Sequence, residues 1–314
     1  MREAVIRKLT ALAEKDRRII LVTGDLGFGV LTDFAKRFPK QYLNAGVAEQ
    51  NLLGLAVGLS LEGRIAIAYS IANFPTLRCL EQVRNDACYH EANVKIVAVG
   101  GGFSYGALGF SHHATEDIAI LRALPGMTVV SPGDRWEAGE AIEALIQKPG
   151  TAYLRLDKSY ANTDPPLQTR FELGRFRRVK EGTDLSLLVT GGILGHAMEA
   201  ASVLEGRGIS CRVYSVHTIK PFDHDELATA VAETGGILTI EEHTLEGGLG
   251  GAVAESCLDR GLRPRAFARM GLPGTFASIV GSQEYLRKRY QLDSGSIEAA
   301  VSRLHAGAVR ARAS

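Results

Sequence analysis

The sequence predicts an α/β protein with two domains, each a mainly parallel β-sheet flanked by helices. Three observations support this fold class. The 314 residues suffice for two domains of ordinary size. Short β-branched runs that end at Gly, Pro or Ser alternate with helical stretches, as in sheets whose parallel strands are joined by crossover helices. Near the middle of the chain the alternation stops in a polar segment and then resumes, which indicates a second domain.

The first domain is predicted to span residues 1–157. It opens with an amphipathic helix, because residues 1–18 carry an apolar stripe and lack the apolar core of a signal peptide. Strands are expected at 18–24, 64–70, 94–101, 127–132 and 152–156. Helices are expected between them at 48–61, 75–91, 115–124 and 134–148. This order predicts helices on both faces of the sheet.

Residues 158–182 are predicted to form an interdomain linker. They are polar, lack a clear period and contain Pro165-Pro166, and one strand at 171–179 is expected within them. The second domain, residues 183–314, returns to the earlier pattern. Its expected elements are strands at 184–192, 209–216 and 235–242, a helix ending near 206 and a helix at 249–260.

The composition excludes several classes of function. Hydrophobic residues make up 46% and charged residues 23%, as in globular proteins with a packed core. With 36 basic and 35 acidic residues the formal charge is +1, so we expect no nucleic-acid partner and no membrane partner. The cysteines lack CxxC spacing and are interpreted as reduced thiols of a cytoplasmic protein: Cys79, Cys88, Cys211 and Cys257.

The helix predicted at 48–61 begins with an acidic residue, Glu49, and continues almost wholly apolar. A helix that is apolar all round is expected to be buried, so Glu49 should lie near the core. Burying a carboxylate is unfavourable unless it is paired or protonated, which favours a chemical role. The alternative is structural, since the same carboxylate could complement the helix dipole and cap free N–H groups.

Two loops follow predicted strands, where α/β sheets place their ligands. The loop after the strand at 64–70 carries Phe74, whose ring could stack on a planar ligand or pack in the core. The loop after the strand at 94–101 is long and glycine-rich, and it ends in His112 and His113. Adjacent histidines on such a loop indicate acid–base work or anion binding. A metal site is not expected, because adjacent residues point apart and no third ligand is near in the sequence.

These segments stand in the order found in the transketolase family. The chain resembles the C-terminal part of that family over nearly its whole length: a pyrimidine-binding domain followed by the transketolase C-terminal domain. The resemblance rests on TGD at 23–25, AGVAEQN at 45–51, YS at 69–70, RxxEQVR at 78–84, SHHATEDIAILRALPGMTVVSPGD at 111–134, HTIKPFD at 217–223 and EEHTLEGGLG at 241–250. It implies transfer of a two-carbon ketol unit from a ketose to an aldose or aldehyde, with thiamine diphosphate as the cofactor.

The resemblance also implies which residues meet the cofactor. Glu49 occupies the position of the glutamate that hydrogen-bonds the aminopyrimidine ring and activates the cofactor by acid–base catalysis. Phe74, with Tyr69 as the second choice, occupies the position of the aromatic residue that stacks on the pyrimidine. Asp25 and Leu26 follow the first strand, where related enzymes contact the cofactor near its thiazolium ring.

Contacts with a small sugar or ketose substrate are implied for a second set of residues. His112, or His113 beside it, is expected to take a catalytic part by meeting the carbonyl or hydroxyl of the substrate. Arg78, Arg155 and Lys158 are expected to hold substrate groups. Lys158 stands where the family usually has an arginine for a sugar phosphate, and a lysine binds phosphate as a point charge without the bidentate fork.

Two departures from the family pattern concern the substrate. Leu108 stands where an acidic residue usually reads a substrate hydroxyl, and the serine that helps to bind phosphate after the first strand is missing from GDLGFGVL. These departures argue against a standard pentose-phosphate donor and acceptor. They lead to the hypothesis of a less polar or unphosphorylated substrate.

The chain lacks the family's diphosphate-binding motif, in which GDG and a later Asn hold Mg²⁺. Gly24-Asp25 is followed by Leu26 and by no matching Asn, and Mg²⁺ needs oxygen ligands besides the phosphates. We therefore expect no metal ligand in this chain, and a partner subunit that ligates Mg²⁺ in a heterotetramer of two small and two large subunits. The active site would lie between the subunits, at a large apolar interface for which the Gly/Ala-rich helix at 48–61 is a candidate. A self-dimer through the two domains of this chain is also expected.

Three alternatives remain open at this point. The β subunit of a 2-oxo-acid dehydrogenase has the same architecture, although HTIKPFD and SHHATED fit the transketolase branch better. A deoxyxylulose-phosphate-synthase-like carboligase would release CO₂ from a 2-oxo acid, whereas ketol transfer would not. A catalytically inactive binding subunit is the third, and retention of Glu49 argues against it, because a buried acid without a cofactor would only destabilise the fold.

Overall fold

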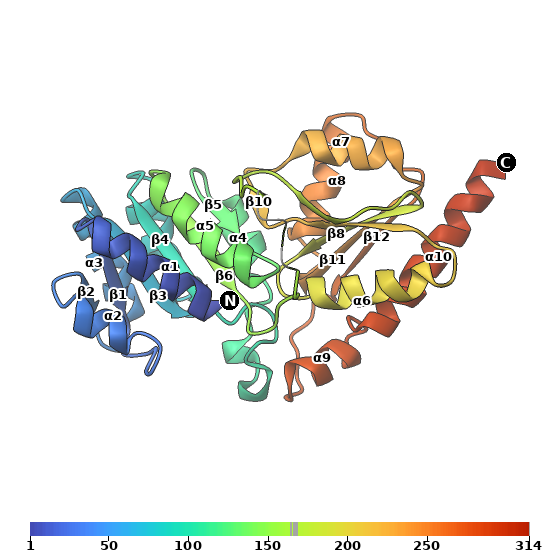
Figure 1. The fold of residues 1–314 in the computed structure, drawn as a ribbon. Helices are drawn as coiled ribbons and strands as arrows, with labels where there is room; N and C mark the ends of the chain where they lie inside the picture. Colours follow the sequence, from blue (N-terminus) through green and yellow to red (C-terminus); the bar gives the residue numbers. More distant parts are fainter. Residues whose placement is uncertain (164, 166–168, 314) are drawn as a thin grey trace.

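The computed structural model describes residues 1–163, 165 and 169–313; residues 164 and 166–168 of the predicted linker, including Pro166, lie outside the described residues. Two sheets lie side by side, and helices cover both faces of each (Figure 1). The predicted fold class is confirmed. Among the described helices, none combines the length and the apolar character that a bilayer crossing requires.

The first sheet has the strand order β10-β5-β6-β4-β3-β1-β2. Its strands are β1 (Ile19–Thr23), β2 (Tyr42–Asn44), β3 (Ile65–Ile71), β4 (Val94–Val99), β5 (Thr128–Val130), β6 (Ala152–Leu156) and β10 (Thr218–Lys220). All neighbouring pairs are parallel except β10 with β5. Every residue of β1, β4, β5 and β6 is buried, because helices cover the sheet on both sides.

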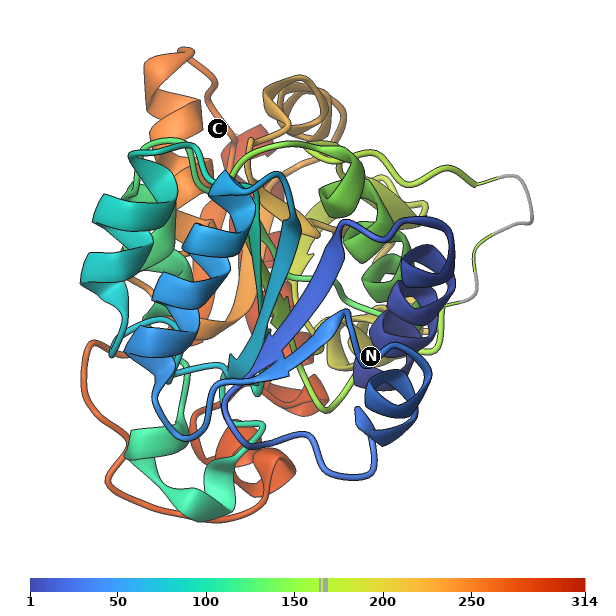
Figure 2. The same ribbon diagram turned by 90° about the vertical axis from the view of Figure 1, so that its left-hand side faces the viewer.

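The helices of the first domain lie on both faces of this sheet, as Figure 2 shows. They are α1 (Arg2–Lys15), α2 (Thr32–Arg37), α3 (Glu49–Leu61), the π-helical η1 (Gln82–Cys88), α4 (Asp117–Ala123) and α5 (Arg135–Gln147). On one face α1 packs on α5, and the core there includes Leu9, Phe34 and Leu145. On the other face α3 packs on η1, and Leu53 and Val83 belong to that core.

The second sheet has the strand order β12-β11-β8-β9-β7. Its strands are β7 (Arg177–Lys180), β8 (Leu185–Thr190), β9 (Cys211–Ser215), β11 (Ile237–Thr244) and β12 (Phe267–Leu272), and β7 is antiparallel to β9. Its helices are α6 (Leu194–Glu205), α7 (His224–Glu233), α8 (Leu249–Asp259), α9 (Gln283–Arg289) and α10 (Ser294–Ala313). The apolar core behind α3 and α4 continues into this domain through Tyr214, Ile219 and Leu249.

Several elements were not predicted from the sequence, among them β2, β12, α9 and α10, and three further elements differ from the sequence prediction. The helix expected at 75–91 is a run of turns followed by η1. The strand expected at 171–179 is shortened to β7, which pairs with β9 and so belongs to the second sheet. β10 comes from the second half of the chain yet pairs with β5 of the first sheet. A strand of three residues has no readable period, so its partner is chosen by tertiary contacts.

Within this chain α3 is buried on one face only, whereas the sequence predicted a helix buried all round. Leu52, Leu53 and Ala56 are buried against the sheet, whereas Gly54 and Gly58 are exposed on the opposite side of the helix. A Cβ at either glycine would meet no described atom within 4 Å. One face of this apolar helix is therefore open at the surface of the chain.

Candidate functional site

Glu49 lies at the first turn of α3, and its side chain is buried, with 7% of the residue exposed. Its carboxylate accepts a hydrogen bond from Arg78 Nη1 at 3.4 Å. Within the described part of the chain, no backbone N–H of α3 donates to this carboxylate. The structural alternative, in which Glu49 caps its own helix, therefore has no support from the hydrogen bonds.

A continuous row of side chains starts at Glu49 and crosses the ends of three neighbouring strands. The Arg78 guanidinium lies 3.9 Å from the centroid of the Phe74 ring. The Phe74 and His112 rings are 5.1 Å apart, and those of His112 and Tyr105 are 6.4 Å apart. Lys158 Nζ lies 3.7 Å from the centroid of the Tyr105 ring. We call this set the site row: Glu49, Arg78, Phe74, His112, Tyr105 and Lys158.

The site row lies at the carboxyl edge of the first sheet, where α/β proteins bind ligands. Phe74 follows β3, His112 lies in the loop after β4, and Lys158 follows β6. The row faces the surface, since 52% of the Arg78 side chain is exposed and Phe74 and His112 are half-buried. It offers a carboxylate at one end, aromatic faces along its length and a cation at the other end.

Three of the residues predicted to act here are turned into the core instead. Tyr69 is 2% exposed and belongs to the apolar cluster on the α1 face of the sheet, so it offers no free ring face. His113 is 3% exposed, and its ring lies edge-on against Phe103, with Nε2 3.4 Å from the Gly106 carbonyl. His112 is thus the histidine of the pair that faces the site row.

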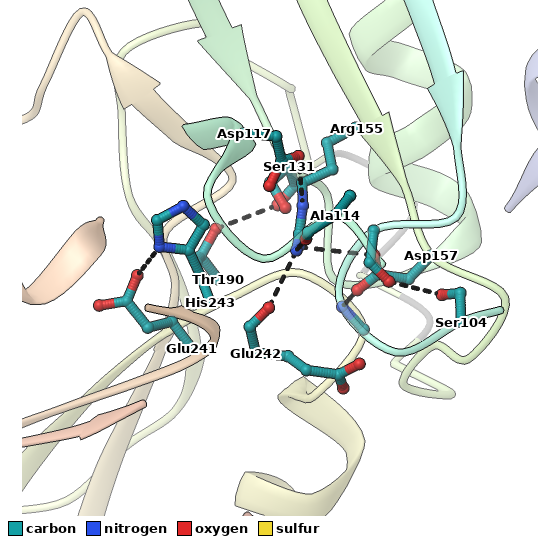
Figure 3. A network of polar contacts seen from close by, with 12 residues as sticks. Ser104, Ala114, Asp117, Ser131, Arg155, Asp157, Thr190, Glu241, Glu242 and His243 are labelled. Carbon is teal, nitrogen blue, oxygen red and sulfur yellow. Dashed lines mark hydrogen bonds and ion pairs between the residues drawn. The ribbon is translucent and has the colours of Figure 1, made fainter. Parts of the chain in front are cut away.

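Arg155, the third residue, is buried between the two domains (Figure 3). Its guanidinium lies 2.9 Å from Asp117 and 3.5 Å from Asp157, and it donates to the backbone carbonyls of Ala114 and Glu242. No part of the side chain reaches the surface. We therefore leave Arg155 out of the substrate site and assign it to the domain interface.

Asp25 and Leu26 lie apart from the site row. Asp25 is exposed, has a φ of 55° and exchanges two hydrogen bonds with Asn44, one from its own N–H at 2.9 Å and one to its carboxylate at 3.0 Å. Leu26 packs at the margin of the α1-side core. Both residues line a shallow pocket of about 340 Å³ with Phe28 and Tyr42.

Burial shifts the pKa values of His113, beside the site row, and of Lys158, at its end. Burial lowers the pKa of His113, so this imidazole is neutral at pH 7. Burial also lowers the pKa of Lys158, and the positive charge of Arg2 lowers it further. His113 therefore adds no positive charge next to the site row.

Among the described residues, no three His, Cys, Asp or Glu side chains are grouped closely enough to hold a metal ion. The site row contains a single carboxylate, and its remaining polar groups are nitrogen donors and the Tyr105 hydroxyl. Mg²⁺ prefers several oxygen ligands. The row thus suits a planar organic group better than a divalent cation.

The sequence interpretation missed Tyr105, which stands between His112 and Lys158. Its ring packs against the backbone of Gly100, whose φ is 111°, and a Cβ at Gly100 would collide with the ring. The run of three glycines at 100–102 was the available signal, because a glycine in such a loop often makes room for a neighbouring ring.

Two family descriptions match the chain. Residues 1–163 match "Transketolase, pyrimidine binding domain" and residues 174–297 match "Transketolase, C-terminal domain". One subunit of the apulose-4-phosphate transketolase of Phocaeicola vulgatus is 36% identical over 302 residues, which cover 94% of this chain and 94% of that protein. A putative transketolase C-terminal section of Methanocaldococcus jannaschii is 36% identical, and the match covers 95% of this chain and 93% of that protein.

Solved structures agree with these matches. A split gene transketolase described as an inactive beta4 tetramer superimposes with a TM-score of 0.89 at 36% identity, covering 97% of this chain and 98% of the other. The transketolase of Leishmania mexicana superimposes with a TM-score of 0.80 at 22% identity, and the match covers 45% of that longer chain. The second likeness concerns the fold alone.

Proposed function

This chain belongs to the transketolase family, and we propose that it is the C-terminal subunit of a split, thiamine-diphosphate-dependent transferase that moves a two-carbon ketol unit from a ketose to an aldose or aldehyde. The observation that carries the proposal is the site row, in which Glu49, Phe74 and His112 lie together at the carboxyl edge of the first sheet. Two relatives for which the match covers at least 92% of both proteins are named as transketolase subunits.

The residues present fit the pyrimidine end of the cofactor. The carboxylate of Glu49 is buried, and within the described residues it accepts one long hydrogen bond, from Arg78. It can therefore also accept a hydrogen bond from a ring N–H. The half-buried Phe74 beside it offers a flat apolar surface for the ring. When bound, the cofactor supplies the nucleophilic carbon that takes up the ketol unit. Glu49 holds a proton at the pyrimidine nitrogen, and His112 donates to an oxygen of the substrate.

The diphosphate end needs a second protein. The described residues contain no oxygen-rich cluster for Mg²⁺. Two relatives for which the match covers at least 93% of both proteins carry the names of a subunit and of a C-terminal section. We propose a larger subunit that binds the diphosphate through Mg²⁺, in a heterotetramer of two subunits of each kind. The open face of α3, with Gly54, Leu55 and Gly58, lies next to Glu49 and supports close packing by another chain there.

We propose a cytoplasmic enzyme that acts on small ketoses. The four cysteines are free and buried, as expected for a reducing compartment. Lys158 is exposed at the far end of the site row and can hold an anionic group. On the loop that carries His112, the apolar side chains of Leu108 and Phe110 are exposed, at 56% and 66%. The hypothesis of a less polar substrate stays a prediction. Robust turnover of xylulose 5-phosphate with ribose 5-phosphate would contradict it.

Calorimetry tests the two-subunit proposal directly. Thiamine diphosphate with Mg²⁺ is titrated into this chain alone and into its mixture with the larger subunit. We expect binding in the mixture only, together with ketol transfer and no release of CO₂ from pyruvate. Tight binding to this chain alone would contradict the proposed partner, and CO₂ release would favour a carboligase of the deoxyxylulose-phosphate-synthase kind.

A further inference from the structure

The loop that carries His112 is closed at its neck by two backbone hydrogen bonds. The Gly102 N–H donates to the Ala114 carbonyl at 2.8 Å, and the Ala114 N–H donates to the Gly102 carbonyl at 3.1 Å. This neck fixes both ends of the segment that contains His112. At the tip of the loop, Asn73 Nδ2 also donates to the Ser111 carbonyl at 3.1 Å, next to His112. The way the neck is held therefore contributes to where His112 lies relative to Phe74.

The neck is held by Glu242, a buried residue of β11 in the second domain. Its carboxylate accepts a hydrogen bond from the N–H of Phe103. A Cβ at Gly102, whose φ is 57°, would collide with the Glu242 carboxylate, so a glycine is needed for this approach. The same carboxylate is fixed within its own domain by Gln283 Nε2 at 3.0 Å and by an ion pair with Arg287.

Further contacts from the second domain hold the same loop. The Tyr290 ring stacks on Phe103 with centroids 5.2 Å apart, and Phe103 in turn meets the edge of the His113 ring at 5.1 Å. The Gly281 N–H donates to the Gly106 carbonyl at 3.3 Å. Figures 1 and 2 both show this loop beside the segment that leads into α9.

We propose that Glu242 is a positioning residue, which fixes the loop at 102–114 through Phe103 so that His112 lies beside Phe74. The inference rests on the proposed function and adds a part for the second domain, which otherwise contributes no residue to the site row. Glu242 lies behind the loop and does not touch substrate or cofactor. It acts through the hydrogen bond to Phe103 and the packing of Phe103 on His113.

The neighbouring Glu241 provides a matched control. Successive residues of a strand point to opposite faces, and Figure 3 shows the two carboxylates directed apart. Glu241 is equally buried and accepts hydrogen bonds from the N–H groups of Leu249 and Gly250 at 2.7 and 2.8 Å. Replacing either glutamate by glutamine sets an amide NH₂ against a donor. Of the two, only Glu242 accepts a hydrogen bond from the loop at 102–114, through the N–H of Phe103.

The experiment compares E242Q and E241Q in the complex with the larger subunit. For E242Q we expect hydrogen exchange to accelerate at the amides of residues 103–112, and kcat/KM per folded enzyme to fall about 100-fold, because misplacing a substrate-binding group by an ångström has such an effect. The Kd for thiamine diphosphate should not change. For E241Q we expect unchanged exchange in this loop and kcat/KM within about 3-fold of the parent.

Equal effects of the two variants on the loop would overturn the proposal, since a general loss of stability would then explain both. Unchanged loop exchange in E242Q would also overturn it. If the parent complex shows no ketol transfer at all, the proposed function fails. The exchange readout then still decides whether Glu242 holds the loop, so the two failures are distinguishable.

Discussion

The carboxylate of Glu49 is buried while its partner, the Arg78 guanidinium, lies 3.4 Å away with half of its side chain in solvent. An exposed cation stabilises a buried anion only weakly, because water screens the pair. A carboxylate held in this way keeps hydrogen-bonding capacity for a ligand. The arrangement distinguishes Glu49 from the buried acids Glu241 and Glu242, which are fully used by backbone or arginine donors.

Replacing Glu49 by glutamine tests this residue. We expect Glu49→Gln to lower kcat by about 100-fold or more, because it removes an acid–base group from the reaction. Assembly with the larger subunit, measured by sedimentation, should be unchanged. Glu62→Gln, at the exposed far end of the same helix, serves as the control and should keep full activity. If Glu49→Gln kept full activity, the proposed catalytic role of Glu49 would be wrong. The alternative of a catalytically inactive binding subunit would then remain.

β11 and α8 meet around a buried acid, Glu241. β11 ends where the chain turns into α8, and the first N–H groups of α8 donate to Glu241. The positive end of the helix dipole favours a negative charge at this point. Burial outweighs these hydrogen bonds and raises the pKa of Glu241 to about 7. The acid is therefore protonated in the folded chain at pH values where it is ionised in the unfolded chain.

This pKa predicts how stability depends on pH. As the pH rises from about 4.5 to about 7, the unfolded chain loses the Glu241 proton while the folded chain keeps it, so the free energy of unfolding should fall by about 3 kcal/mol. Glu241→Gln should remove this contribution. Urea unfolding of both proteins at pH 5 and pH 8 measures the difference. An identical pH dependence for parent and variant would contradict the raised pKa.

The two domains share both a sheet and a core. β10 from the second half of the chain completes the first sheet, and the core behind α4 contains residues of both domains. Arg155 joins them further, since it pairs with two aspartates of the first domain and donates to the Glu242 carbonyl of the second. The chain should therefore behave as one cooperative unit.

Unfolding experiments test this coupling. We expect the chain to unfold in a single transition, with the same midpoint by fluorescence and circular dichroism. Arg155→Met should lower the free energy of unfolding by about 3–5 kcal/mol, because it leaves buried carboxylates without their cation. Arg7→Met, on the exposed side of α1, should change it little. Two separate transitions in the parent chain would contradict the shared core.

Local signals in the amino-acid sequence were enough to predict the α/β class, most strands and the segments that carry Glu49, Phe74 and His112, because hydrophobic periodicity and glycine-rich loops are properties of short stretches. They did not indicate β10, the open face of α3 or the part played by Tyr105. They also did not decide which of Tyr69, His113 and Arg155 reach the site. Neighbouring residues on a strand or loop face opposite ways, and only tertiary packing decides which face remains open: helices of the first domain cover Tyr69, whereas the second domain packs near His113 and Arg155.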